Sequence, residues 1–170
     1  IFFSGCNMKC LFCQNHQISH GGYGRDITPD QLIDCMKHLQ NIGAENINLV
    51  TPPANINLLA ETLKKARTEI SIPIVWNSNG YETVKNLKKL EGLVDIYLPD
   101  FKYSDNSLAK EFSGVPNYFE IAKESIREMR RQQPIDEFDE NGMMKKGVIV
   151  RHLVLPSCTE NTKGVFQEIA

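Results

Sequence analysis

The sequence predicts an α/β fold in which short parallel strands alternate with amphipathic helices. Apolar runs of strand length recur along the chain, and between them apolar residues repeat at the three- and four-residue spacing of a helix face. Strand–helix–strand units of this kind place successive strands in parallel through right-handed crossovers. With 170 residues, the chain is long enough for one domain with a sizeable core.

In the first half of the chain, we expect a strand at residues 1–3 that leads directly into a cysteine-rich loop. Thr28 and Pro29 supply an N-cap and a first-turn proline for a helix that Gly43 ends. The pattern then predicts a strand at 47–50, a helix at 56–66 and a strand at 74–76.

The second half repeats this alternation. A helix marked by Val84, Leu87 and Leu90 precedes a strand at 94–98. A long helical region follows, and residues 139–142 form a turn signal. We then expect a fifth strand at 147–155 and a final helix from about residue 160.

Three closely spaced cysteines follow the first expected strand. Cys6, Cys10 and Cys13 have the spacing C-x3-C-x2-C, with Phe12 directly before the last of them. Three thiolates on one loop can hold three corners of an iron–sulfur cube and leave the fourth iron open, whereas clusters for plain electron transfer use four. An open iron can bind a substrate, so this spacing favours an enzyme.

Disulfides and a structural zinc site are the other uses that these cysteines could have. Three cysteines within eight residues cannot all pair with one another as disulfides. A structural zinc site needs four tetrahedral ligands, and His16 could complete a Cys3His set. Small zinc modules bring their ligands on two separated knuckles, whereas these four residues share one loop. The sequence therefore favours the cluster, with zinc as the alternative.

The cysteine run resembles the signature of the radical S-adenosylmethionine (radical SAM) superfamily. Segments 47–52, 79–84, 94–105 and 150–156 are together similar to the pyruvate formate-lyase activating enzyme-like branch. The similarity covers nearly all of residues 1–170, which we expect to be one radical SAM domain. It implies a partial (βα)6 barrel of the TIM type whose sixth strand lies beyond Ala170. Ile1 falls inside a strand and Ala170 inside a helical pattern, so we expect flanking segments at both ends.

The resemblance implies a [4Fe–4S] cluster on Cys6, Cys10 and Cys13, with S-adenosylmethionine (SAM) on the open iron. One electron from a donor such as flavodoxin or ferredoxin would cleave SAM to methionine and a 5′-deoxyadenosyl radical, which abstracts hydrogen. The favoured substrate is a glycine of a partner glycyl-radical enzyme. A radical SAM enzyme for a small molecule or another protein side chain, and a non-catalytic iron–sulfur or zinc-binding protein, are the alternatives.

Polar residues follow the expected strands, and ligands of parallel α/β folds bind at the carboxyl ends of strands. Asp100 and Lys102 match an Asp-x-Lys pair that the family places near the cofactor; a solvated surface salt bridge is the alternative. Alternation lets one of Arg151 and His152 point inward, and the donor fork of Arg151 suits a carboxylate. The expected cofactor-binding residues are Phe12, Thr51, Asn77, Asn79, Asp100, Lys102 and Arg151.

The chain departs from the family pattern at two places. Family members commonly hold the amine of SAM with a Gly-Gly-Glu motif after the second strand, where this chain has Thr51-Pro52-Pro53. Proline has no N–H, so this loop offers carbonyls and the Thr51 hydroxyl and amide. Asn77 stands where activating enzymes often have Asp, which removes the charge that would hold a cation beside the cofactor.

The bulk composition and charge limit the classes of partner that the sequence predicts. A net charge of -2 without a run of five like charges gives no electrostatic footprint for nucleic acid or an anionic membrane. The apolar stretches are strand-sized, so none is expected to span a bilayer. Five cysteines, three of them metal ligands, fit a reducing compartment, and we expect a cytoplasmic protein. Outside the motifs, Cys35 is expected in the core and Cys158 on a rim loop, as an inert thiol or, alternatively, a reactive one. His16, His20 and Tyr23 are expected on a flexible surface loop, with contact to substrate as the alternative.

Overall fold

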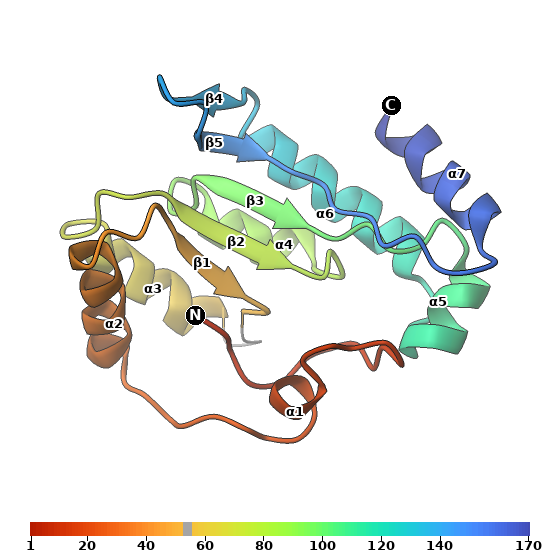
Figure 1. Cartoon of the computed structure of the whole chain (residues 1–170), viewed down its shortest axis with the longest axis horizontal. Helices are drawn as coiled ribbons and strands as arrows, with labels where there is room; N and C mark the ends of the chain where they lie inside the picture. The colour runs from red at the N-terminus through yellow and green to blue at the C-terminus, as the bar shows by residue number, and fades with distance from the viewer. Residues whose placement is uncertain (53–55) are drawn as a thin grey trace.

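The computed structural model describes residues 1–52 and 56–170, and its centre is a five-stranded sheet with the strand order β1-β2-β3-β5-β4 (Figure 1). β1 (Ile47–Val50), β2 (Ile74–Ser78), β3 (Ile96–Pro99) and β5 (Met144–Val148) are parallel neighbours. The short β4 (Glu137–Phe138) pairs antiparallel with β5. The α/β fold with a parallel sheet is thus confirmed, and the barrel is not closed in the described part of the chain.

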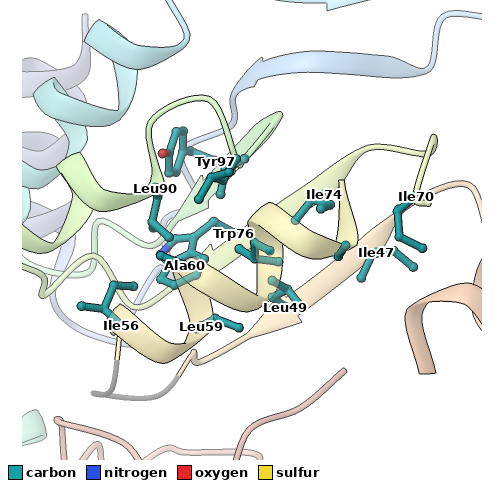
Figure 2. Packing of buried hydrophobic residues seen from close by; sticks show 14 of the residues in the cluster. Ile47, Leu49, Ile56, Leu59, Ala60, Ile70, Ile74, Trp76, Leu90 and Tyr97 are labelled. Atoms are coloured by element: carbon teal, nitrogen blue, oxygen red, sulfur yellow. The ribbon is translucent and has the colours of Figure 1, made fainter. Parts of the chain in front are cut away.

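Helices cover one face of the sheet (Figure 1). They are α2 (Pro29–Asn41), α3 (Ile56–Ala66), α4 (Val84–Leu87) with the 3₁₀ turn η1 (Lys88–Leu90), and α6 (Tyr118–Gln132). Figure 2 shows Leu49 and Trp76 of the sheet packed against Leu59 of α3. Because side chains alternate along a strand, the neighbours of these residues face away from the helices, toward the open side of the sheet.

Helix α2 begins where the sequence predicts. The Thr28 hydroxyl accepts a hydrogen bond from the amide of Gln31 at 3.2 Å, and the Gln31 side chain accepts one from the amide of Thr28 at 2.8 Å. This capping box satisfies two amides that the first turn leaves unpaired, and such a cap stabilises a helix by about 1 kcal/mol.

The expected first and fifth strands differ from the observed ones. Residues 1–3 run beside β1, but only Phe2 forms a bridge, with Val50. β5 begins earlier than expected because it forms a hairpin with β4 across the predicted turn, and its regular pairing ends at Val148. A single further bridge joins Arg151 to Asp100 at the end of β3. The expected strand at 147–155 is therefore mostly extended loop.

Three further helices lie near the cysteine loop or follow the last strand. α1 (His16–Ser19) falls inside the segment expected to be a flexible loop, and α5 (Asn106–Ser113) precedes α6. α7 (Thr159–Ile169) confirms the final helix. Across residues 1–52 and 56–170, every helix is too short or too polar to cross a bilayer.

Candidate active site

The cysteine loop is packed into a second hydrophobic core. Met8, which is 1% exposed, lies in this core with Tyr103 and Tyr118, and Cys6 and Cys10 pack against it. The amide of Lys9 donates a hydrogen bond to the carbonyl of Ser113 at 2.9 Å, and the amide of Leu11 donates one to the carbonyl of Phe112 at 2.8 Å. The loop therefore lies against the C-terminal end of α5, as the red trace in Figure 1 shows.

Each thiol of the motif has a polar partner from a different element. Cys6 Sγ accepts from Asn79 Nδ2 at 3.5 Å, and Cys10 Sγ accepts from the Ser113 hydroxyl at 3.0 Å. Cys13 Sγ lies 3.2 Å from the Ser19 hydroxyl. All three cysteines are half-buried and free of disulfides. Burial raises the pKa of the Cys10 thiol, an effect that the Ser113 hydroxyl and the Lys102 ammonium partly offset.

The donor set suits an iron–sulfur cluster. Three free thiols on one loop supply the three thiolates that a cube with one open iron needs. Among the described residues, no three His, Cys, Asp or Glu side chains surround a single point as the ligands of one metal ion would. Each thiolate of a cube binds its own iron, so these sulfurs need not converge on one ion as zinc ligands do. His16 is exposed, and its ring contacts that of His20 with centroids 5.4 Å apart.

Charged residues meet where β2, β3 and the segment after β5 end. Arg151 Nη2 donates to Asn77 Oδ1 at 2.7 Å and lies 2.8 Å from Asp100 Oδ1. The other oxygen of Asp100 lies 2.5 Å from Lys102 Nζ. The structure thus brings together four of the seven residues expected to bind SAM.

This network carries an excess of positive charge. Asp100 and Lys102 are 18% and 14% exposed, so their pair is not a solvated surface salt bridge. One carboxylate stands between two cations, Lys102 and Arg151. The surplus charge at a half-buried rim suits an anionic group such as a carboxylate.

The loop after β2 is tied both to the cysteine loop and to the end of β3. Asn79 Nδ2 donates to Asn7 Oδ1 at 2.6 Å, and its contact with Cys6 joins the two loops. Gly80 has a φ of +77°, and a Cβ there would meet the carbonyl oxygen of Asp100 at 2.2 Å. Tyr118 reinforces the junction, since its hydroxyl is 2.8 Å from the carbonyl oxygens of both Asn79 and Asp100. These contacts fix Asn79 and Asp100 relative to Cys6.

The remaining expected residues lie around this centre. Thr51 has a φ of +51°, and its amide donates to the carbonyl of Asn77 at 2.9 Å; Pro53 of the same loop lies outside the described residues. Phe12 is half-buried and packs against the second core. The ring nitrogens of His152 lie 2.7 Å from the Phe101 carbonyl oxygen and 3.0 Å from the Thr162 hydroxyl. His152 is therefore packed against neighbouring residues of the fold.

The two other cysteines differ from the thiols of the motif in their surroundings. Cys35 is half-buried at the edge of a surface hollow beside Leu39, whereas we expected it in the core. Cys158 is half-buried against the second core.

Sequence reasoning missed three contributors to the site. Ser113 and Ser19 contact thiols, and the Glu82 carboxylate lies in a cavity beside the cysteine loop. Serine and glutamate at helix ends are ordinary surface residues, so no local pattern distinguishes them. Their roles depend on contacts made in the folded chain, between residues 6 apart for Ser19 with Cys13 and 103 apart for Ser113 with Cys10.

A loop of three thiols at the carboxyl ends of parallel strands, beside a positively charged rim, is the arrangement expected of a metal-cluster site in a parallel α/β protein. The chain belongs to the radical SAM superfamily, whose family model matches residues 1–145. Members of this superfamily use a [4Fe–4S] cluster and SAM, so membership indicates an enzyme.

Individual proteins are similar to the chain in sequence or in fold. An uncharacterized protein of Methanocaldococcus jannaschii, MJ0674, is 35% identical over 171 residues, which cover 94% of this chain and 46% of that protein. The chain thus spans about half the length of this curated relative. The crystal structure of methylornithine synthase (PylB) is similar with a TM-score of 0.67 and 16% identity, over 99% of this chain and 49% of that one.

Streptococcus suis SuiB provides a second solved comparison. The SuiB structure bound to SAM has a TM-score of 0.67 and 12% identity, over 98% of this chain and 36% of SuiB. The SuiB structure bound to its precursor peptide SuiA gives 0.66 and 13%, over 98% and 35%. At these identities the likeness is one of fold.

Proposed function

We propose that residues 1–170 are part of a radical SAM enzyme in which Cys6, Cys10 and Cys13 hold the [4Fe–4S] cluster. One observation carries the proposal: three free thiols lie on one loop beside the charged rim of Asp100, Lys102 and Arg151. When bound and reduced by an external one-electron donor, the cluster would transfer an electron to the sulfonium of SAM, which would yield methionine and the 5′-deoxyadenosyl radical that abstracts hydrogen.

The residues of the rim bind and orient SAM in this proposal. Lys102 and Arg151 attract its carboxylate, because their two charges exceed the one charge of Asp100. Asp100 holds both cations in position and has lone pairs to spare for a ribose hydroxyl.

Neutral groups complete the proposed cofactor site. Asn77 orients Arg151, Asn79 joins Cys6 to the β2 loop, and the Thr51 hydroxyl supplies a further acceptor. Phe12 covers the cofactor and excludes water from it.

The proposed substrate is a backbone glycine in a partner glycyl-radical enzyme. Support comes from the order of the segments at 47–52, 79–84, 94–105 and 150–156, which is similar to activating enzymes. The electron donor is a flavodoxin or ferredoxin, and the compartment is the cytoplasm. A small-molecule or other protein substrate is the second candidate, since the solved neighbours include a methylornithine synthase and a structure bound to a precursor peptide.

Anaerobic reconstitution tests the catalytic core of this proposal. The protein should bind about four irons and, with a strong reductant, convert SAM to 5′-deoxyadenosine and methionine, as measured by liquid chromatography. Cys6→Ala, Cys10→Ala and Cys13→Ala should each abolish the cluster, whereas Cys35→Ala should retain it. Stoichiometric zinc without iron would overturn the proposal in favour of a zinc protein.

The substrate needs a separate experiment. After reduction with SAM and a glycyl-radical enzyme encoded nearby, electron paramagnetic resonance should show a glycine-centred doublet. Absence of that doublet, together with deuterium transfer from a labelled small molecule into 5′-deoxyadenosine, would establish the second candidate.

A further inference from the structure

A cavity of about 420 Å³ opens beside the cysteine loop. Its lining comes from the cysteine loop, the end of β1, and β2 with the segment that leads into α4. The lining includes Cys6, Asn7, Thr51, Trp76, Asn79 and Glu82. The volume lies within the usual range for small-molecule sites. A ligand in this cavity would therefore lie between the Cys6 end of the loop and the Glu82 carboxylate.

Glu82 is held in place by the indole of Trp76. Trp76 Nε1 donates to the two carboxylate oxygens of Glu82 at 2.9 and 3.2 Å. Trp76 itself is 1% exposed, so the donor is fixed by the core. A carboxylate has about four acceptor positions, and the Trp76 N–H together with the Ser78 hydroxyl leaves some of them unused. Glu82 can therefore accept further hydrogen bonds from a ligand.

The cavity offers this carboxylate no positive partner. Within the described residues, the lining contains no Lys, Arg or His, and Glu82 forms no ion pair. Burial raises the pKa of Glu82 and outweighs the opposing hydrogen bonds from Ser78 and Trp76. Asp100 differs, because it contacts two cations. Glu82 is thus a desolvated carboxylate without a counter-ion.

The chemistry of the lining selects among ligands. An anionic group would be repelled by Glu82, and a divalent cation would need more carboxylate or carbonyl oxygens than one side chain supplies. A primary ammonium group carries one positive charge and three donors. Glu82 matches the charge, and the polar residues Thr51 and Asn79 belong to the same lining.

We propose that this cavity binds a primary ammonium group against the Glu82 carboxylate. The inference rests on the proposed function, because it takes the cavity beside Cys6 as part of a SAM-dependent site. Two ligands could carry the ammonium group: SAM, through its methionine part, or the substrate. The Thr51-Pro52 segment has no carboxylate, so for SAM the charge would have to come from Glu82.

Binding measurements on the anaerobically reconstituted protein test this inference. Calorimetry would compare SAM with its desamino analogue, in which hydrogen replaces the ammonium group, in the wild type and in Glu82→Gln. Glutamine keeps a carbonyl acceptor for Trp76 but removes the charge. Glu61→Gln is the matched control, because Glu61 is 67% exposed and pairs with Lys64 on the surface of α3.

A second arm tests the substrate as the source of the ammonium group. With SAM saturating, propylamine and propanol would be titrated while the fluorescence of Trp76 is recorded. Trp76 is the single tryptophan of the chain, and its N–H contacts Glu82, so its emission reports on this cavity.

The outcomes separate the two sources. If SAM supplies the group, wild type should bind SAM about tenfold or more tightly than the desamino analogue, and Glu82→Gln should remove that difference. If the substrate supplies it, the two cofactors should bind alike and propylamine, but not propanol, should change the Trp76 emission in wild type and not in Glu82→Gln. Equal binding of the cofactors with no response to propylamine overturns the inference.

Two further results remain decisive. Wild type that carries no cluster and binds no SAM would refute the proposed function, while the propylamine titration would still test the cavity. If Glu82→Gln fails to fold, the wild-type preferences for SAM over its desamino analogue and for propylamine over propanol decide the matter.

Discussion

The hydroxyl of Ser113 lies 3.0 Å from the sulfur of Cys10 and 2.6 Å from the hydroxyl of Tyr103. Ser113 is fully buried at the end of α5, so this donor is held by the fold. Hydrogen bonds to ligand sulfurs are one of the means by which a protein tunes the potential of an iron–sulfur cluster.

Ser113→Ala should lower the reduction potential of the reconstituted cluster. The hydrogen bond favours the more negative, reduced state, and a loss of about 1 kcal/mol corresponds to roughly 40 mV for one electron. Anaerobic redox titration would measure the shift. Ser125→Ala is the control, since Ser125 is equally buried and its hydroxyl has no hydrogen-bond partner within the described residues. An unchanged potential in Ser113→Ala would contradict the prediction.

Lys102→Ala and Asp100→Ala should each weaken SAM binding by about 1.5–3 kcal/mol, the range of a charge-assisted hydrogen bond. Iron content should stay at the wild-type level, because neither residue is a proposed ligand. Asp100→Ala should also destabilise the protein more, since it leaves Lys102 and Arg151 close together without their shared carboxylate. Calorimetry and urea unfolding would measure the two effects. Wild-type affinity in both variants would show that the network is only structural.

Gly80→Ala should destabilise the fold by about 2–4 kcal/mol. The residue has a φ of +77°, and its Cβ would collide with the Asp100 carbonyl oxygen at 2.2 Å. Gly92→Ala is the matched control, because Gly92 has a φ of +76° but a Cβ there meets nothing within 4 Å. The control should cost about 1–2 kcal/mol, the backbone penalty alone. If urea unfolding showed equal losses of stability in Gly80→Ala and Gly92→Ala, the loop after β2 would be able to shift away from the new Cβ without strain.

Glu82→Gln should raise the melting temperature at pH 7. The pKa of Glu82 is raised above its ordinary value of 4.5, so the folded protein binds this proton more tightly than the unfolded chain does. Its contribution to stability is therefore full below pH 4.5 and is lost as the pH rises through the folded pKa. The difference between variant and wild type should vanish on acidification below pH 4.5. A variant that is less stable at pH 7 would show that the Trp76 hydrogen bond outweighs desolvation.

The sequence correctly predicts the cap of α2 and the parallel sheet, whereas it does not predict the hairpin of β4 and β5. The capping box at Thr28 involves residues three apart, so the pattern and the contact coincide. The strand expected at 147–155 was wrong over most of its length, because β4 sets where β5 begins and no periodicity reveals that hairpin. Alternation correctly separated Arg151, which meets Asn77, from His152, which meets Thr162.

The meeting of four candidate-site residues was predicted, because these residues follow the strands. Asn77, Asp100, Lys102 and Arg151 lie at strand ends, where parallel topology brings them together. Glu82 was missed because its importance depends on Trp76, whose indole reaches it only after β2 is buried. The two residues are only six apart in the sequence, but neither a strand nor a helix pattern predicts a contact at that spacing.

The burial of Met8 in the second core has a consequence for how the cluster is acquired. A thiol-bearing loop that folding has already immobilised is preorganised, so iron and sulfide meet ligands whose chain entropy is already lost. Cluster assembly then requires no folding of the loop, whereas zinc fingers fold only when they bind their metal. Iron removal by a chelator should accordingly leave the far-ultraviolet circular dichroism of the domain unchanged.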